Sequence, residues 1–148
     1  MNMIALIIGV LVSVIIIARF KKTRLESNRF SYALLLFTFP FYYFIFSVYG
    51  NDYDALQLEF LGAIVFFIIA VLSLKVDVFY SYNLLAIGYV LHGVYDMTHS
   101  LFFINVSVPV WWPEFCGVID IILGLYLINL AFKHRLGHGL SVSRYDNR

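Results

Sequence analysis

Three ionisable side chains, His92, Asp96 and His99, stand four and three residues apart within one apolar segment of the chain. Residues with these spacings share one face of a helix, so the three side chains are expected to form a single stripe. An imidazole beside a carboxylate can transfer protons or hold a metal ion. Tyr89 and Tyr95 border this stripe, and we expect them to line the same pocket.

Two carboxylates from other apolar segments, Glu59 and Asp120, could complete the site. With a rise of about 1.5 Å per helical residue, Glu59, Asp96, His99 and Asp120 all fall at the depth of the outer leaflet. His92 falls near the middle of the membrane. The sequence therefore predicts a polar pocket among three helices that opens outward and is closed below.

The residue types leave the chemistry of this pocket open. Asp96 and His99 have the i, i+3 spacing with which four-helix carboxylate proteins hold a metal ion. One divalent ion bound by Asp96, His99 and either Glu59 or Asp120 is therefore one hypothesis, with His92 as an outer partner or proton relay. Without a metal, His92 and Asp96 are candidates for a catalytic acid–base pair. An Asp–His hydrogen bond that only holds two helices together is the structural alternative.

The composition identifies the elements that must position these side chains. Of the 148 residues, 62% are hydrophobic and 13% are charged, whereas a soluble domain has about 25% charged residues. Five segments approach the roughly 20 residues that a helix needs to cross a bilayer: residues 4–20, 30–49, 55–74, 82–104 and 114–132. We predict an all-α, five-helix transmembrane bundle forming one domain over residues 1–133, followed by a short cytoplasmic polar tail over residues 134–148.

The basic residues predict the orientation of this bundle. All ten Lys and Arg lie in the first loop, the third loop or the C-terminal tail, which a five-span topology puts on one side of the membrane. Lys and Arg near span ends stay on the cytoplasmic side. The N-terminus is therefore expected outside the cell and the C-terminus inside.

Small residues and one proline predict how the segments pack. Gly117 and Gly124 share a face with Asp120, and Gly62, Gly88 and Gly93 offer similar contacts on the third and fourth segments. Small residues let membrane helices approach closely. Pro40 lies within the second segment and is expected to kink it.

Three stretches resemble a family of small bacterial integral membrane proteins that is defined only as a domain of unknown function. They are "LEFLGAIVFFIIAVLSLK", "LHGVYDMTHSL" and "VPVWWPEFCGVIDIILGLYL". The family pattern, E-x-x-G, H-x-x-x-D and W-aromatic-P-x-x-C-x-x-x-D, is carried here by Glu59, His92, Asp96, Trp111, Pro113, Cys116 and Asp120. The resemblance covers residues 58–127 and implies a bacterial inner membrane, without implying an activity or a cofactor.

Three functions remain open on the sequence. The first is a pocket that binds a metal ion or a proton-coupled small hydrophobic molecule. The second is a membrane enzyme that isomerises or hydrolyses a lipid or isoprenoid through His92 and Asp96, and the third is an accessory subunit of a membrane complex. The expected partners are the lipid bilayer and a second copy of the chain. No nucleic-acid motif appears, so nucleic acid is not an expected partner.

Overall fold

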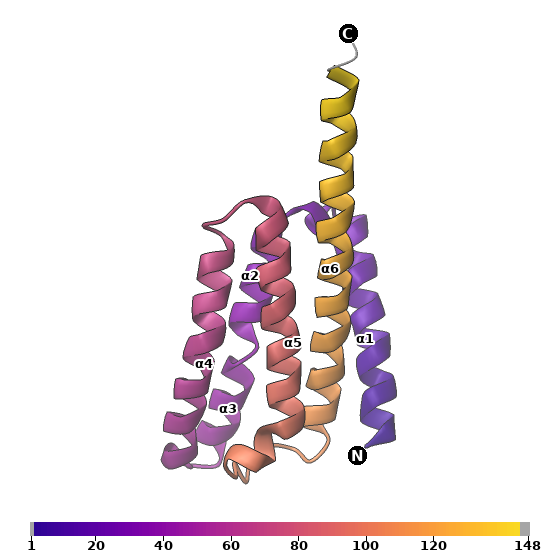
Figure 1. Cartoon of the computed structure of the whole chain (residues 1–148). Coiled ribbons are helices and arrows are strands. Elements are labelled where there is room, and N and C mark those ends of the chain that lie inside the picture. The colour runs from indigo at the N-terminus through magenta and orange to yellow at the C-terminus, as the bar shows by residue number, and fades with distance from the viewer. Residues whose placement is uncertain (1, 146–148) are drawn as a thin grey trace.

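The computed structural model describes the backbone of residues 2–145 and the side chains of residues 2–136. This part of the chain is all-helical, as predicted, and none of its residues lies in a strand. The elements are α1 (Met3–Lys22), the 3-10 turn η1 (Leu25–Ser27), α2 (Arg29–Thr38), α3 (Phe41–Tyr49), α4 (Tyr53–Ser73), α5 (Val78–Phe102) and α6 (Trp112–Tyr145). The helices run side by side as a bundle (Figure 1).

Four segments are long and apolar enough to cross a membrane: Met3–Lys22, Arg29–Tyr49, Tyr53–Ser73 and Trp112–Leu136. They correspond to four of the five predicted spans and support a membrane protein. The remaining predicted span, residues 82–104, corresponds to α5, which has 25 residues and lies beside α6 within the bundle (Figure 1). The polar residues of α5 make it less apolar than the other four segments.

The second predicted span is broken as Pro40 suggested. α2 ends at Thr38 and α3 begins at Phe41, so Phe39 and Pro40 separate two shorter helices. Proline cannot donate a backbone hydrogen bond and its ring collides with the preceding turn, which explains the break. The break places Phe39 and Tyr43 against α5, where both contact site residues.

The two ends of the bundle differ in charge. The N-terminus, the α3–α4 turn and the α5–α6 loop lie at one end, which we call the loop end (Figure 1). At the opposite end, α6 continues beyond the other helices through residues 134–145 of the predicted tail (Figure 1), and residues 146–148 of that tail lie outside the described residues. The described basic side chains all belong to this second end: Arg19, Lys21, Lys22, Arg24, Arg29, Lys75, Lys133 and Arg135.

Glycines bring α5 and α6 into backbone contact. A Cβ added at Gly93 would lie 2.8 Å from the carbonyl oxygen of Gly117, and a Cβ at Gly117 would lie 3.0 Å from the carbonyl oxygen of Gly93. A Cβ added at Gly124 would likewise lie 3.0 Å from the carbonyl oxygen of Ala86. The predicted close approach is therefore made between α5 and α6, and it places the carboxylate that follows Gly117 beside the stripe on α5.

The other two predicted glycines serve different contacts. Gly88 faces α2 and α4, where an added Cβ would lie 2.7 Å from side-chain atoms of Leu36 and Ile69. Gly62 faces Tyr95, and an added Cβ would lie 3.3 Å from the Tyr95 hydroxyl oxygen. Leu36 belongs to the apolar core, which lies mainly between α2, α5 and α6. Apolar packing along one side of α5 thus fixes the rotation of this helix, and the rotation decides which of its side chains face the polar site.

Candidate functional site

All the predicted site residues except Tyr89 fall into two groups of buried or partly buried side chains. The central cluster consists of His92, Asp96 and Asp120. The loop-end cluster consists of Glu59, Tyr95, His99 and Asn105. α5 contributes to both groups, because its polar stripe extends over two turns.

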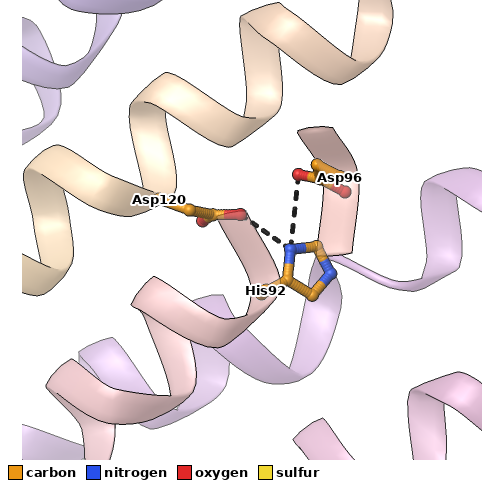
Figure 2. Close-up of side chains that lie close together, drawn as sticks. All are labelled: His92, Asp96 and Asp120. Atoms are coloured by element: carbon orange, nitrogen blue, oxygen red, sulfur yellow. Dashed lines mark hydrogen bonds and ion pairs between the residues drawn. The ribbon is translucent and has the colours of Figure 1, made fainter. Parts of the chain in front are cut away.

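The central cluster joins α5 to α6. His92 Nδ1 lies 2.7 Å from Asp120 Oδ2 and 3.5 Å from Asp96 Oδ2 (Figure 2). The exposed fraction is 2% for His92 and 0% for each aspartate. One ligand-capable atom from each residue lies within 4.8 Å of the other two. Among the described residues, this is the one group of three metal-binding side chains that meets that distance.

The central cluster has more hydrogen-bond acceptors than donors. The Tyr43 hydroxyl donates to Asp96 Oδ1 at 2.8 Å. Among the described residues, no donor forms a hydrogen bond to Asp96 Oδ2 or Asp120 Oδ1, although both atoms are buried. Buried polar atoms are normally hydrogen-bonded, so two such oxygens in one cluster need an explanation.

Aromatic side chains surround the central imidazole. The rings of Phe66 and Phe39 lie 4.6 Å and 5.8 Å from the ring of His92, measured between centroids. Neither phenyl ring can donate a hydrogen bond to the carboxylates of the cluster. They cover the imidazole with apolar surface, and such surroundings strengthen the electrostatic interactions within the cluster.

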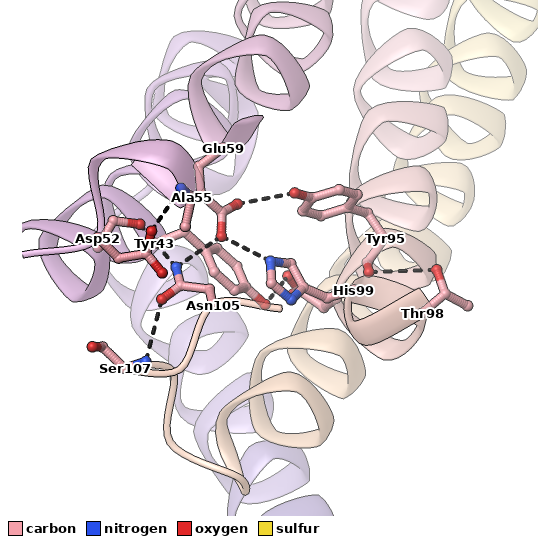
Figure 3. Close-up of polar contacts among 11 residues, drawn as sticks. Tyr43, Asp52, Ala55, Glu59, Tyr95, Thr98, His99, Asn105 and Ser107 are labelled. Atoms are coloured by element: carbon pink, nitrogen blue, oxygen red, sulfur yellow. Dashed lines mark hydrogen bonds and ion pairs between the residues drawn. The ribbon is translucent and has the colours of Figure 1, made fainter. Parts of the chain in front are cut away.

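The loop-end cluster is fully hydrogen-bonded around its carboxylate. Glu59 Oε1 lies 2.8 Å from His99 Nε2 and accepts from Asn105 Nδ2 at 3.0 Å, and Oε2 accepts from the Tyr95 hydroxyl at 2.9 Å (Figure 3). Asn105 also donates to Ser47 Oγ at 2.8 Å. The cluster therefore ties the α5–α6 loop to α3, α4 and the end of α5.

This division changes the predicted ligand set. Asp96 and Asp120 meet as expected, but Glu59 and His99 pair with each other in the second group. Two contacts contribute to this division: the Gly93–Gly117 approach brings Asp120 to α5, and Tyr43 stacks its ring on His99 at 4.7 Å while its hydroxyl bonds to Asp96. His92, expected as an outer partner, lies instead between the two aspartates.

The two predicted pocket tyrosines have different surroundings. Tyr95 contacts the loop-end cluster through its bond to Glu59, as its position beside the stripe predicted. Tyr89 is fully buried in the apolar core, where its hydroxyl donates to the Tyr32 carbonyl at 2.8 Å. Tyr89 therefore belongs to the packing between α5 and α2 rather than to a polar pocket.

Sequence reasoning missed two polar residues of the site. Tyr43 lies in the aromatic run "FTFPFYYFIF", where nothing distinguishes it from its neighbours except its place three residues after Pro40. Asn105 lies in the α5–α6 loop, 6% exposed, and its spacing carries no helical or strand signal. Both were hidden because their partners are more than 40 residues away.

Two cavities reach the polar groups. The loop-end cavity, of about 520 Å³, is lined by residues that include Asp96, His99 and Asn105. The apolar cavity, of about 200 Å³, lies on another side of the cluster, with His92, Phe39 and Cys116 among its lining residues. The central cluster thus adjoins two cavities, and the loop-end cavity is the one whose wall also includes carboxylates.

Comparison of the chain with known protein families, with curated proteins and with solved structures found no match. The resemblance to a family of small bacterial membrane proteins therefore stays a prediction. Its pattern residues lie in three places. The acidic and histidine positions fall in the two clusters, and Cys116 lines the apolar cavity. Trp111 directly precedes α6, and Pro113 lies in its first turn.

Proposed function

We propose that this protein is an integral membrane protein whose central cluster binds one divalent metal ion. The observation that carries this proposal is the pair of buried carboxylate oxygens, Asp96 Oδ2 and Asp120 Oδ1, without a hydrogen-bond donor. Each belongs to a carboxylate that lies beside the His92 imidazole. A cation would provide these oxygens with the partner that the described side chains do not supply.

The charge of the cluster supports the same assignment. If His92 is protonated, it offsets one aspartate and leaves one negative charge in the interior of the bundle. An unpaired charge at this depth costs on the order of 3 kcal/mol or more. A divalent ion held by a neutral imidazole and two carboxylates makes the group neutral.

The donor types narrow the class of metal. One nitrogen and carboxylate oxygens suit Zn²⁺, Mn²⁺ or Fe²⁺, whereas Cu⁺ prefers sulfur. Metal–ligand bonds of about 2 Å put neighbouring ligand atoms roughly 3.3 Å apart around a tetrahedral ion. The separations of His92 Nδ1 from Asp120 Oδ2, 2.7 Å, and from Asp96 Oδ2, 3.5 Å, lie on either side of that value, and Asp120 Oδ1 is the other oxygen of the same carboxylate. Three protein ligands leave the fourth position open to water or a substrate.

A second candidate function rests on the apolar cavity. This cavity has His92 in its wall, and Asp120 lies 2.7 Å from the imidazole. Asp120 would orient the ring while the imidazole exchanges a proton with a bound lipid or isoprenoid, as in general acid–base catalysis. Under this alternative the protein is a membrane enzyme with His92 and Asp120 as its pair, and Asp96 as a neighbouring carboxylate.

The charge difference between the ends supports a proposed orientation. The basic end would face the cytoplasm, with the N-terminus and the loop end outside, because Lys and Arg remain on the cytoplasmic side. The membrane proposed is the bacterial inner membrane, with the lipid bilayer as the first partner. A homodimer and a complex with another membrane protein stay predictions of the sequence.

The test is metal analysis of the protein purified in lipid nanodiscs without chelator. We expect near-stoichiometric zinc, manganese or iron in the wild type, and its loss in Asp120→Asn. Asp54→Asn is the matched control, because Asp54 is an exposed carboxylate at the start of α4. Metal that survives Asp120→Asn, or a metal-free wild type that also fails to bind added zinc, would overturn the metal proposal. The metal-free result would favour the acid–base alternative.

A further inference from the structure

The loop-end cavity connects the surface of the protein with the central cluster. Its walls come from the end of α5, the α5–α6 loop, the start of α6 and Leu6 of α1. Ser100, on its rim, is exposed, whereas Asp96 in its wall is fully buried. Asp96 is also a member of the central cluster. The cavity therefore opens to the exterior and is bounded by one of the proposed metal ligands, which has no exposed surface of its own.

The charges of the cavity favour positive ions. Most of its lining residues are apolar, and the two carboxylates among them are Asp96 and Glu114, which accepts from the Asn2 backbone N–H at 3.2 Å. His99 also lines it, and none of the described residues that line it is a lysine or an arginine. The described basic side chains lie at the opposite end of the bundle. Carboxylates in a cleft that has no lysine or arginine attract ions of the opposite sign and accelerate their binding.

The size of the cavity suits a hydrated ion. A water molecule occupies about 30 Å³ of liquid, so an ion with six waters needs roughly 180 Å³. The 520 Å³ of the cavity exceeds that volume. One wall is held in place by Asn105, which donates to Ser47 and Glu59. The cavity therefore has room for a hydrated divalent cation beside the wall that contains Asp96, and the cation would have to shed water to contact this buried carboxylate.

We infer that the loop-end cavity is the access route through which a hydrated divalent cation reaches the central cluster. This inference rests on the proposed metal binding. It adds the direction of access, from the loop end, and the selection for cations at the entrance. Asp96 is the residue at which the cation would begin to exchange water for protein ligands.

The first part of the test measures cation selection without any metal. In a Cys116→Ala background, Ser100→Cys places a thiol at the rim of the cavity, and Thr23→Cys places one at the basic end. Each thiol is modified with a cationic and an anionic methanethiosulfonate reagent, and the rate ratio is normalised to that of a free thiol. We expect a cationic preference of about tenfold for Ser100→Cys, reduced by Glu114→Gln, and no cationic preference for Thr23→Cys.

The second part measures zinc exchange after the rim is blocked with a neutral benzyl reagent. Zinc release to a fluorescent chelator should slow about tenfold in modified Ser100→Cys, with the dissociation constant unchanged, and modified Thr23→Cys should behave as unmodified protein. The inference is overturned if Ser100→Cys shows no cationic preference, or if zinc exchange ignores complete modification of its thiol. Absence of zinc binding to the unmodified protein would overturn the proposed function, and this access route with it.

Discussion

The central and loop-end clusters contain similar histidine–carboxylate pairs with opposite hydrogen-bond balance. The His92–Asp120 distance is 2.7 Å and the His99–Glu59 distance is 2.8 Å, and all four side chains are buried. At the loop end, both oxygens of Glu59 have partners. At the centre, two of the four aspartate oxygens have no hydrogen-bond donor among the described residues.

This difference shows that a buried histidine–carboxylate pair does not by itself mark a binding site. A carboxylate whose acceptors are satisfied holds the structure together, as Glu59 holds Asn105 and the α5–α6 loop. A carboxylate with a free acceptor in a buried group needs a further partner. We therefore expect variants of the two clusters to separate metal affinity from stability.

The largest expected effect is on metal affinity at the centre. Asp120→Asn removes a charged ligand, and loss of even an outer partner weakens binding about 10-fold to 100-fold. Zinc affinity, measured by competition with a chelator, should therefore fall by more than about 100-fold. The metal-free variant should lose less stability than Glu59→Ala, because Asp96 remains 3.5 Å from the His92 imidazole and the asparagine oxygen can still accept a hydrogen bond from it. A destabilised variant with unchanged zinc affinity would reverse the roles assigned to the two clusters.

The next largest effect is on stability at the loop end. Glu59→Ala leaves Tyr95, His99 and Asn105 without their shared acceptor, and breaking a buried charged pair costs about 3–5 kcal/mol. The free energy of unfolding should fall by that amount, while zinc affinity stays close to the wild-type value. Glu59→Gln, which keeps an acceptor oxygen, is the milder control. If Glu59→Ala abolished zinc binding in a stable protein, Glu59 would be a ligand, as the sequence first suggested.

The comparison also depends on the close contact between α5 and α6. Gly93→Ala puts a methyl group 2.8 Å from the Gly117 carbonyl oxygen, so the helices must separate at a cost of about 1–3 kcal/mol. Zinc affinity should fall as well, because the separation moves Asp120 away from His92. Gly62→Ala is the control, since its methyl would meet only the end of the Tyr95 side chain, at 3.3 Å. Equal thermal stability of the two variants would contradict this packing.

The smallest expected effect concerns Tyr43, which touches both clusters. Tyr43→Phe keeps the stacking on His99 but removes the hydrogen bond to Asp96. Zinc affinity should weaken about tenfold through loss of an outer partner, and stability should fall by only about 0.5–1.5 kcal/mol. Tyr42→Phe, at a partly exposed neighbouring tyrosine, should change neither quantity. A zinc affinity of Tyr43→Phe equal to that of Tyr42→Phe would remove Tyr43 from the site.

Much of the site could be predicted because its members share one helix face. The spacing of His92, Asp96 and His99 correctly indicated a buried stripe, and the glycines beside Asp120 indicated the contact that brings α6 to it. The pairing within the site could not be predicted in the same way. It depends on how far each helix is rotated about its axis and on Tyr43, whose position follows from the break at Pro40.

The sequence by itself determined the helical class, the apolar segments, the break at Pro40 and the basic end. These properties follow from residues that act within one segment, through hydropathy, backbone restriction and charge. The tertiary structure alone decided that Asp96 joins His92 and Asp120 while Glu59 joins His99 and Asn105. That outcome is set by contacts between segments distant in the chain, above all the Gly93–Gly117 approach, which fixes the distance and rotation of α5 against α6.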